Sequence, residues 1–422
     1  MRRFVVLPWA LGFLLLMASN CANDPVRPDP FTVRAIPQEI ASQVEEVVRA
    51  NNAFTFDFYG SVRKDETGNL FCSPYSVATA LSMAMAGAAG ETDTEIRRVL
   101  RATRPEGELH PAMGALIASL NRGTALLGYE LATANRIWAQ EGFPFLDSCL
   151  DVLRTDYLAE LGTLDFTKDP EACRATINDW VESRTRDRIR DLFPAGAIDG
   201  NTRMVLANAI YFKGLWAVQF DPEDTRDLPF RVDAARSVTA PFMHRSLETR
   251  FGGDGTARIA ELPYKGKDLS MIVILPIAAD GLSAVEESLS VEQLDAWMGT
   301  LETHTWDVYL PRFTFTSRFA LNQVLSGLGM PGAFDPERAD FSDLDGRRDL
   351  FLQAVVHKAF IAVNEEGTEA AAATGISVGI TSLPPEFRAD HPFLFLIRDN
   401  LTGSVLFLGR VLDPSAAAGS GM

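Results

Sequence analysis

The sequence predicts one large globular domain of mixed α/β class, on three observations. The composition is that of an ordinary globular protein, with 47% hydrophobic and 23% charged residues, and it excludes disorder and a polytopic membrane protein. Length alone, 422 residues, would suggest two or three domains, yet no repeat and no linker rich in Pro, Gly and Ser lies between Gln38 and Asp413. The third observation is an ordered series of motifs, described below, which favours a single domain.

The N-terminus has the pattern of a signal peptide, which we place at residues 1–20. Arg2 and Arg3 precede an apolar run, residues 4–17, that is too short to span a bilayer comfortably. The next residues resemble a loose bacterial lipobox, in which Cys21 would be the first mature residue and would carry the lipid anchor on its thiol. The alternative is ordinary secretion with Cys21 near a conventional cleavage site. We therefore expect an exported protein, either a lipoprotein tethered to a membrane (periplasmic or at the cell surface) or a secreted one.

The two ends of the mature chain are expected to lie outside the domain. Residues 21–37 are rich in Pro and Asp without periodicity and predict a flexible tether. Residues 414–422 predict a disordered tail. The domain itself is expected at residues 38–413.

Charge and cysteine content exclude several classes of function. The formal net charge of −17 argues against nucleic acid and anionic polysaccharide as partners, since both require basic patches. The arginines of residues 97–104 are followed by acidic residues, which indicates a solvated helix face and no heparin-type cofactor. Cys72, Cys149 and Cys173 are odd in number and lack C-x-x-C spacing, so we expect no disulfide framework, metal site or cofactor.

The most informative segment predicts two structures at once. From residue 368 to residue 380, every second side chain is small or apolar, and the side chains between them are acidic, tiny or hydroxylic. This is the period of a strand with one buried face. The small, nearly uncharged composition and the double proline at residues 384–385 equally indicate an exposed loop. We therefore predict that the segment moves between the two states.

The beginning of this segment resembles the hinge of the reactive-centre loop in the serpin family of protease inhibitors. Further motifs resemble those of serpins and occur in the family's order: NLFCSPYS at residues 69–76, GAAGET at 87–92, NAIYFKGLW at 208–216, LPRF at 310–313, VHKA at 356–359 and DHPFLFLIRD at 390–399. The resemblance implies one α/β (mixed α+β) serpin domain. It would contain a large central sheet, surrounding helices, smaller sheets and an exposed reactive-centre loop at about residues 365–387.

The resemblance implies inhibition by a loop that is first cleaved and then inserted into the sheet. A target serine protease would be acylated by the loop and trapped in a covalent complex, and the hinge would become a new strand. The alternation supports this independently, because the inward positions carry no charge that would oppose burial. The hinge residues are Glu365, Gly367, Thr368, Glu369, Ala370, Ala371, Ala372, Ala373 and Thr374.

Alignment on Glu365 implies a scissile bond between Thr381 and Ser382, with Ile380 as the neighbouring residue. A small or aliphatic residue before the cut indicates elastase-like or subtilisin-like targets. The nearest basic residue, Arg388, lies beyond the prolines, which argues against trypsin-like targets. Papain-like cysteine proteases remain an alternative, because the specificity of many of them depends on the second residue before the scissile bond, here Ile380. We expect a monomer, and a non-inhibitory binding or structural protein of the same fold is the alternative function.

The resemblance also brings Ser73, Ser76, Asn208 and His357 together near the centre of the large sheet, where the serpin shutter parts to admit the loop. Buried polar groups there must be satisfied by hydrogen bonds. A static core network is the alternative interpretation of these four residues.

One catalytic motif is present, and we reject it. Residues 375–379 read G-x-S-x-G, but this nucleophile pattern requires a helix directly after it, and the double proline prevents one. His391 is the only histidine that follows, and it belongs to a strand motif. The remaining histidines stand alone and are interpreted as surface or packing residues: His110, His244 and His304. We therefore predict no catalytic residue.

Overall fold

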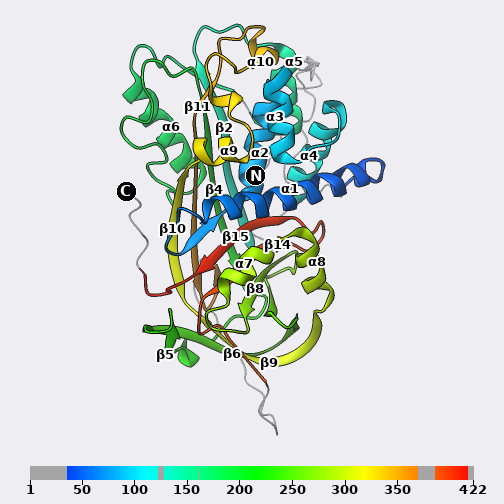
Figure 1. The fold of residues 1–422 in the computed structure, drawn as a ribbon, viewed down its shortest axis with the longest axis vertical. Helices are drawn as coiled ribbons and strands as arrows, with labels where there is room; N and C mark the ends of the chain where they lie inside the picture. Colours follow the sequence, from blue (N-terminus) through cyan, green and yellow to red (C-terminus); the bar gives the residue numbers. More distant parts are fainter. Residues whose placement is uncertain (1–35, 122–127, 160, 369–384, 417–422) are drawn as a thin grey trace, which may run out of the picture.

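The protein is described here by a computed structural model that covers residues 36–121, 128–159, 161–368 and 385–416. In this part of the chain, the strands form two sheets and the helices cover them (Figure 1). Long strands run along the longest axis of the molecule, and the N-terminal helices lie beside their upper half (Figure 1). None of the described helices has the length and apolar character needed to cross a membrane.

The first sheet has six strands, and the burial of its long inner strand indicates that helices or loops cover both faces of the sheet. β4 (Met204–Leu215) is an almost continuous apolar run that is buried along nearly its whole length, as expected for a strand covered on both faces. The order across the sheet is β10 (Phe313–Ala320), β11 (Leu352–Asn364), β12 (Gly367–Thr368), β4, β2 (Tyr129–Gln140) and β3 (Gly162–Leu164).

The second sheet has nine strands and is mainly antiparallel. Two of its inner strands, β8 and β14, are mainly apolar and are buried along almost their whole length, with Ser270, Arg398 and Asp399 as their polar residues. The order is β1 (Leu70–Cys72), β15 (Val405–Val411), β14 (Phe393–Asp399), β8 (Leu269–Pro276), β7 (Ala257–Pro263), β6 (Ser237–Gly253), β9 (Glu302–Pro311) and β13 (Glu386–Arg388), with β5 (Arg226–Arg231) attached to β6.

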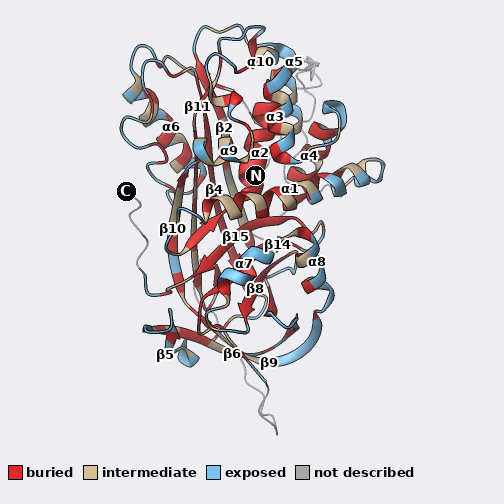
Figure 2. Ribbon diagram, in the orientation of Figure 1, coloured by how far each residue is buried: buried red, intermediate tan, exposed pale blue. Residues whose placement is uncertain are grey.

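The helices differ in how deeply they are buried. α2 (Pro74–Met85) is buried at every residue, begins with Ser73 as its N-cap and Pro74 at its first position, and contacts strands of both sheets. The others have exposed faces (Figure 2). They are α1 (Ala41–Val62), α3 (Gly90–Leu100), α4 (Glu106–Leu120), α5 (Asp147–Asp156), α6 (Pro170–Arg184), α7 (Leu282–Ser288), α8 (Val291–Gly299), α9 (Asn322–Leu328) and α10 (Ser342–Asp345), with 3-10 turns η1 (Gln38–Ile40), η2 (Pro222–Asp224) and η3 (Gly332–Phe334).

Alternate residues of β4 belong to two different cores. Leu206 and Ile210 join the large core that also contains α2 and the second sheet. Val205 and Ala207 join a smaller core beneath α6. Because successive side chains of a strand point to opposite faces, the six-stranded sheet is covered on both sides.

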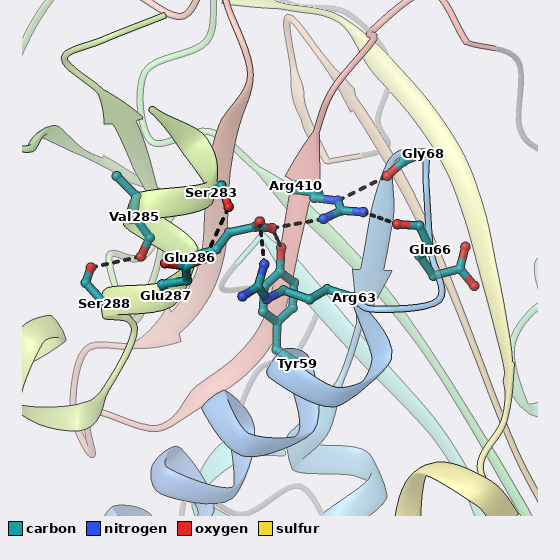
Figure 3. A network of polar contacts seen from close by, with 10 residues as sticks. All are labelled: Tyr59, Arg63, Glu66, Gly68, Ser283, Val285, Glu286, Glu287, Ser288 and Arg410. Carbon is teal, nitrogen blue, oxygen red and sulfur yellow. Dashed lines mark hydrogen bonds and ion pairs between the residues drawn. The ribbon is translucent and has the colours of Figure 1, made fainter. Parts of the chain in front are cut away.

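A buried ion cluster joins the N-terminal helix to the C-terminal strand (Figure 3). The Glu286 carboxylate accepts hydrogen bonds from the Tyr59 hydroxyl at 2.6 Å, from Arg63 at 3.1 Å and from Arg410 at 3.1 Å. Arg410 also donates to the backbone carbonyl oxygens of Glu66 and Gly68. The cluster thus connects α1, α7, β15 and the chain between α1 and β1.

The cysteines at 72, 149 and 173 are buried free thiols.

Candidate functional site

The chain reverses direction tightly where β11 ends and β12 begins. The Asn364 side-chain oxygen accepts hydrogen bonds from the backbone N–H groups of Glu366 and Gly367, at 3.1 Å and 3.3 Å, and so stabilises the turn. Gly367 has φ = 154°, and a Cβ added there would lie 1.9 Å from the Gly214 carbonyl oxygen. Only glycine fits this position, because no side chain can be accommodated so close to β4.

β12 separates two strands that are otherwise paired with each other. β11 and β4 pair directly in parallel over most of their length, from Leu352 opposite Met204 to Phe360 opposite Tyr211. Beyond that point, β12 lies between them and pairs with both. The six-stranded sheet is therefore parted at one end, and the first hinge residues occupy the opening.

Thr368 is buried at the tip of this inserted segment, with 1% of its surface exposed. Its hydroxyl lies 2.9 Å from the Tyr264 hydroxyl. The Tyr264 ring stacks on Trp216 at 4.8 Å and meets Phe212 edge to face at 5.0 Å. Burial raises the pKa of Tyr264, so its hydroxyl stays protonated and can share a hydrogen bond with Thr368.

Glu365 anchors the base of the hinge. Its buried carboxylate accepts a hydrogen bond from Arg312 Nε at 2.6 Å, and the same oxygen contacts Arg312 Nη2 and the Thr225 hydroxyl. Its backbone carbonyl accepts from the Phe220 N–H at 2.8 Å. A carboxylate removed from water needs such donors, and here one oxygen has three of them. The hinge therefore begins at a fixed point.

The four residues expected at the centre of the sheet do lie together. His357 on β11 and Asn208 on β4 occupy directly opposite positions and are joined by a 2.5 Å contact between Nδ1 and Oδ1. The His357 Nε2 atom accepts a hydrogen bond from the Ser73 N–H at 2.9 Å. Asn208 donates to the Ser76 hydroxyl at 2.8 Å. The cluster therefore connects the N-terminus of α2 with two strands of the six-stranded sheet.

A fifth member of this cluster, Asn135 on β2, is not among the residues expected from the sequence. Its side-chain oxygen accepts hydrogen bonds from Asn208 at 2.6 Å and from Ser76 at 3.1 Å. The available signal was an asparagine inside an otherwise strand-forming segment, where this residue type is uncommon. With Asn135, the cluster extends over three adjacent strands, β11, β4 and β2.

The hydrogen bonds determine the protonation state of His357. Because the Ser73 N–H is a donor, Nε2 must be unprotonated, and the proton must lie on Nδ1, which donates to Asn208. Burial lowers the pKa of His357 to about 3, and the contact with Asn208 opposes this shift. The ring is therefore neutral at physiological pH. A second proton would face the Ser73 N–H and disrupt the cluster.

Comparison with known proteins identifies the fold family. A family model described as "Serpin (serine protease inhibitor)" matches residues 49–414. The chain belongs to the serpin family. A protein named leukocyte elastase inhibitor, from Xenopus tropicalis, is 39% identical over 379 residues, which are 88% of this chain and 100% of that protein.

Two solved serpin structures superpose on this chain. Uncleaved ovalbumin matches with a TM-score of 0.81 and 32% identity, over 87% of this chain and 100% of its own. Human thyroxine-binding globulin, solved in complex with thyroxine, matches with a TM-score of 0.81 and 31% identity, over 89% of this chain and 100% of its own. The serpin fold expected from the sequence is thus confirmed.

Several expected site residues of this serpin lie outside the described residues. They are the anchor Cys21, the hinge residues Glu369, Ala370, Ala371, Ala372, Ala373 and Thr374, and the reactive residues Ile380, Thr381 and Ser382.

One expectation about a histidine is wrong. His391 lies in the turn before β14 and not within a strand, and its Nε2 contacts the Pro276 carbonyl oxygen at 2.8 Å. The turn is needed here because the chain must pass from β13 to β14, which lie on different parts of the second sheet. His391 therefore links this turn to the end of β8.

Proposed function

We propose that this serpin is a suicide-substrate inhibitor of serine endopeptidases that cleave after small or aliphatic residues, such as elastase-like or subtilisin-like enzymes. The observation that supports this most is the entry of β12 between β11 and β4, with Thr368 buried at its tip. The hinge already has the conformation of a strand at the position where an inserted loop would begin. Its next residues need only continue in the same direction along β4.

The chemical step would be ordinary proteolysis that stops at the acyl-enzyme ester, before water hydrolyses it. The protease serine attacks the Thr381 carbonyl, an ester forms, the peptide bond to Ser382 breaks, and the leaving amine takes up a proton. The freed hinge then inserts and carries the acylated protease with it. Inhibition depends on insertion being faster than hydrolysis of the ester by water.

Insertion of the loop would release enough free energy to drive this mechanism. Residues 368–381 are fourteen in number, and at roughly 1 kcal/mol net per backbone hydrogen bond their insertion would gain on the order of 10 kcal/mol. Against this gain stands the central polar cluster. His357 and Asn208 face each other across the β11–β4 boundary, so a strand inserted between them must break their hydrogen bond. We assign the cluster of Ser73, Ser76, Asn208 and His357 this resisting role in the shutter.

The proposed target class has two supports. The residue before the proposed scissile bond, Thr381, is small, and Ile380 beside it is aliphatic. A relative 39% identical to this chain is named leukocyte elastase inhibitor. Papain-like cysteine proteases are the second target class, because Ile380 fits their preference for the residue one place before the cut.

A different function is also compatible with the fold. Thyroxine-binding globulin, similar in structure to this chain, was solved with thyroxine bound, so a serpin can be a carrier of a small molecule. In a carrier or structural protein, the loop would be cut without trapping the protease. The entry of Thr368 between the strands favours the inhibitor, because only the inhibitor requires rapid insertion.

Incubation with an elastase and a subtilisin, followed by denaturing gels, separates the two functions. The inhibitor produces a covalent band heavier than either protein, together with some cleaved serpin. Cleaved serpin without any covalent band, across serine and papain-like proteases, would reject the proposal.

The location of the protein forms a second proposal. We infer an exported monomer held at a membrane by lipidated Cys21 through the tether at residues 21–37, with the sequence of the N-terminus as support. Palmitate labelling of the wild type and of Cys21→Ala tests it. Label in both proteins, or in neither, would reject the lipid anchor.

A further inference from the structure

The C-terminal end of the expected reactive-centre loop is held by a short strand. β13 has three residues and is the last strand in the order of the second sheet, where it pairs in parallel with β9. Two backbone hydrogen bonds flank it, from the Asp307 N–H to the Pro385 carbonyl and from the Ala389 N–H to the Tyr309 carbonyl, each at 2.9 Å. A short strand at the edge of a sheet opens easily, so its position depends on the contacts at its two ends.

His391 supplies a further anchor directly after β13. It is buried, with 6% of its surface exposed. Its Nδ1 atom lies 2.8 Å from an Asp390 carboxylate oxygen, and its Nε2 atom lies 2.8 Å from the Pro276 carbonyl oxygen at the end of β8. The Asp390 carbonyl in turn accepts a hydrogen bond from the Arg231 N–H of β5 at 2.7 Å. The chain that leaves β13 is thereby fixed to β8 and to β5.

Both oxygens that face the His391 ring are acceptors. A neutral imidazole has one N–H group, so one of its nitrogens would turn a lone pair toward an oxygen lone pair. Both contacts are hydrogen bonds only when each nitrogen has a proton, and the ring is then an imidazolium. This arrangement differs from that of His357, whose Nε2 faces an N–H donor and whose ring is neutral.

The charges around His391 favour its cationic form. Burial alone would raise the pKa of Asp390, but the hydrogen bond from His391 and its positive charge, with Arg388 adding to them, lower that pKa overall. The carboxylate therefore stays ionised in mild acid and balances the imidazolium. The other charged residues that the described contacts bring to this segment are Arg388 of β13 and Arg231 of β5, while β8 contributes an uncharged carbonyl.

We propose that His391, in its cationic form, is a positioning residue that holds the C-terminal end of the loop and keeps the Arg388–Ala389 bond away from proteases. Ala389 is fully buried, and the Arg388 guanidinium lies over the Tyr309 ring at 4.1 Å. A trypsin-like enzyme requires an accessible, extended segment around an arginine, so it cuts here only when β13 opens. The anchor is complete while both nitrogens of His391 are protonated and weakens as the pH rises. This role goes beyond the proposed inhibition, because it involves neither cleavage at Thr381 nor trapping.

Nitrogen-15 NMR of the full chain labelled at histidine tests the protonation state, with His391→Gln to assign the signal. We expect two protonated ring nitrogens for His391 at pH 7. A single protonated nitrogen at that pH would overturn the proposal.

Trypsin digestion followed by mass spectrometry tests the protection. The measured quantity is the initial rate at which a fragment beginning at Ala389 appears, divided by the rate for a peptide substrate at the same pH. For the wild type this ratio should rise roughly tenfold between pH 7 and pH 9, because the opening equilibrium of β13 loses one charge-assisted hydrogen bond. His391→Gln should be cut faster at pH 7 and show no such rise. A wild-type ratio that is independent of pH, or an equal rise in His391→Gln, would overturn the proposal.

Asp390→Asn separates proton-dependent anchoring from a merely structural role. In this variant the new amide N–H can donate to Nδ1, and a neutral ring keeps both contacts by donating its own N–H to the Pro276 carbonyl. Cutting at Arg388 should then be slow at pH 7 and at pH 9 alike, and a rise equal to that of the wild type would overturn the proposal.

His244→Gln is the matched control. This histidine of β6 stacks on the Tyr309 ring at 4.4 Å, so its replacement should leave the wild-type rise unchanged. A loss of the rise in this variant would assign the pH dependence to the wrong histidine and would overturn the proposal. Circular dichroism shows whether each variant has folded, and Asp390→Asn remains decisive if His391→Gln has not. Trypsin is not a proposed target, so failure of the inhibitory function would leave these results intact.

Discussion

The hydroxyl groups of Tyr264 and Thr368 lie 2.9 Å apart at the parted end of the six-stranded sheet. Tyr264 follows β7 of the other sheet, and Thr368 is the last residue of the inserted hinge segment. The tyrosine ring is itself held by stacking on Trp216. The entrance to the sheet therefore has a specific partner for the first inward side chain of the hinge.

Thr368→Arg should convert the serpin from an inhibitor into a substrate. A guanidinium at this buried position would cost several kcal/mol unless paired, so the hinge would not enter in time. The measurement is the ratio of covalent complex to cleaved serpin on denaturing gels with a subtilisin. Thr368→Ser, which keeps the hydroxyl, is the matched control and should trap as the wild type does. Trapping by Thr368→Arg at the wild-type ratio would show that this side chain does not enter the sheet.

Tyr264→Phe should weaken the attachment of Thr368 to the sheet, while the aromatic ring keeps its packing. The substitution removes one hydroxyl, leaves the Thr368 hydroxyl without this partner and costs roughly 1 kcal/mol. We expect a lower midpoint of thermal unfolding and more cleaved serpin per trapped protease. Tyr309→Phe, a half-buried tyrosine on β9 away from the hinge, is the control. If the two variants behave alike, the Tyr264 hydroxyl has no special part in hinge entry.

His357 should make the protein less stable in mild acid. Its pKa is about 3 in the folded state and about 6.5 in an unfolded chain. Its contribution to stability is thus complete above pH 6.5 and is lost as the pH falls toward 3, because the unfolded chain binds the proton first. Between pH 7.5 and pH 5.0 the loss is about 2 kcal/mol.

Urea unfolding of the wild type and of His357→Gln at both pH values measures this effect. Burial also lowers the pKa of His110, to about 4, so both proteins lose some stability in acid. The wild type should lose about 2 kcal/mol more than the variant. Equal losses would mean that His357 is not a buried neutral ring.

Glu286→Ala should destabilise the fold strongly. It leaves Arg410, whose side chain is 7% exposed, and Arg63 without their shared carboxylate (Figure 3). Breaking a buried ion pair by removing one partner costs about 3–5 kcal/mol. Thermal unfolding followed by circular dichroism measures it, with the exposed neighbour Glu287→Ala as control, which should change stability by less than about 0.5 kcal/mol. Similar midpoints for the two variants would contradict the structural role of the cluster.

The sequence predicts some parts of this site and not others, for physical reasons. Period-two alternation is a local property, so the inward orientation of Thr368 follows from its neighbours, and the structure buries it. Its partner Tyr264 is 104 residues away, and no local pattern connects the two. Arg312 belongs to a motif recognised in the sequence, yet its contact with Glu365 depends on where β9 and β10 meet the hinge.

The fold could be predicted from the sequence, whereas many of the contacts within it could not. The order of the motifs along the chain was sufficient for the serpin fold, because a shared chain order implies a shared topology. A cavity bordered by α2, α4, α6, β2 and the chain after α5 could not be predicted, since these segments are distant in sequence.

Intact-mass spectrometry of the reaction with a subtilisin is the most direct test of trapping by loop insertion. We predict a covalent adduct with the mass of the protease plus the serpin up to Thr381, minus one water, and a released peptide that begins at Ser382. A released peptide that begins elsewhere would contradict the proposed bond. Cleaved serpin with no covalent adduct would contradict inhibition by loop insertion.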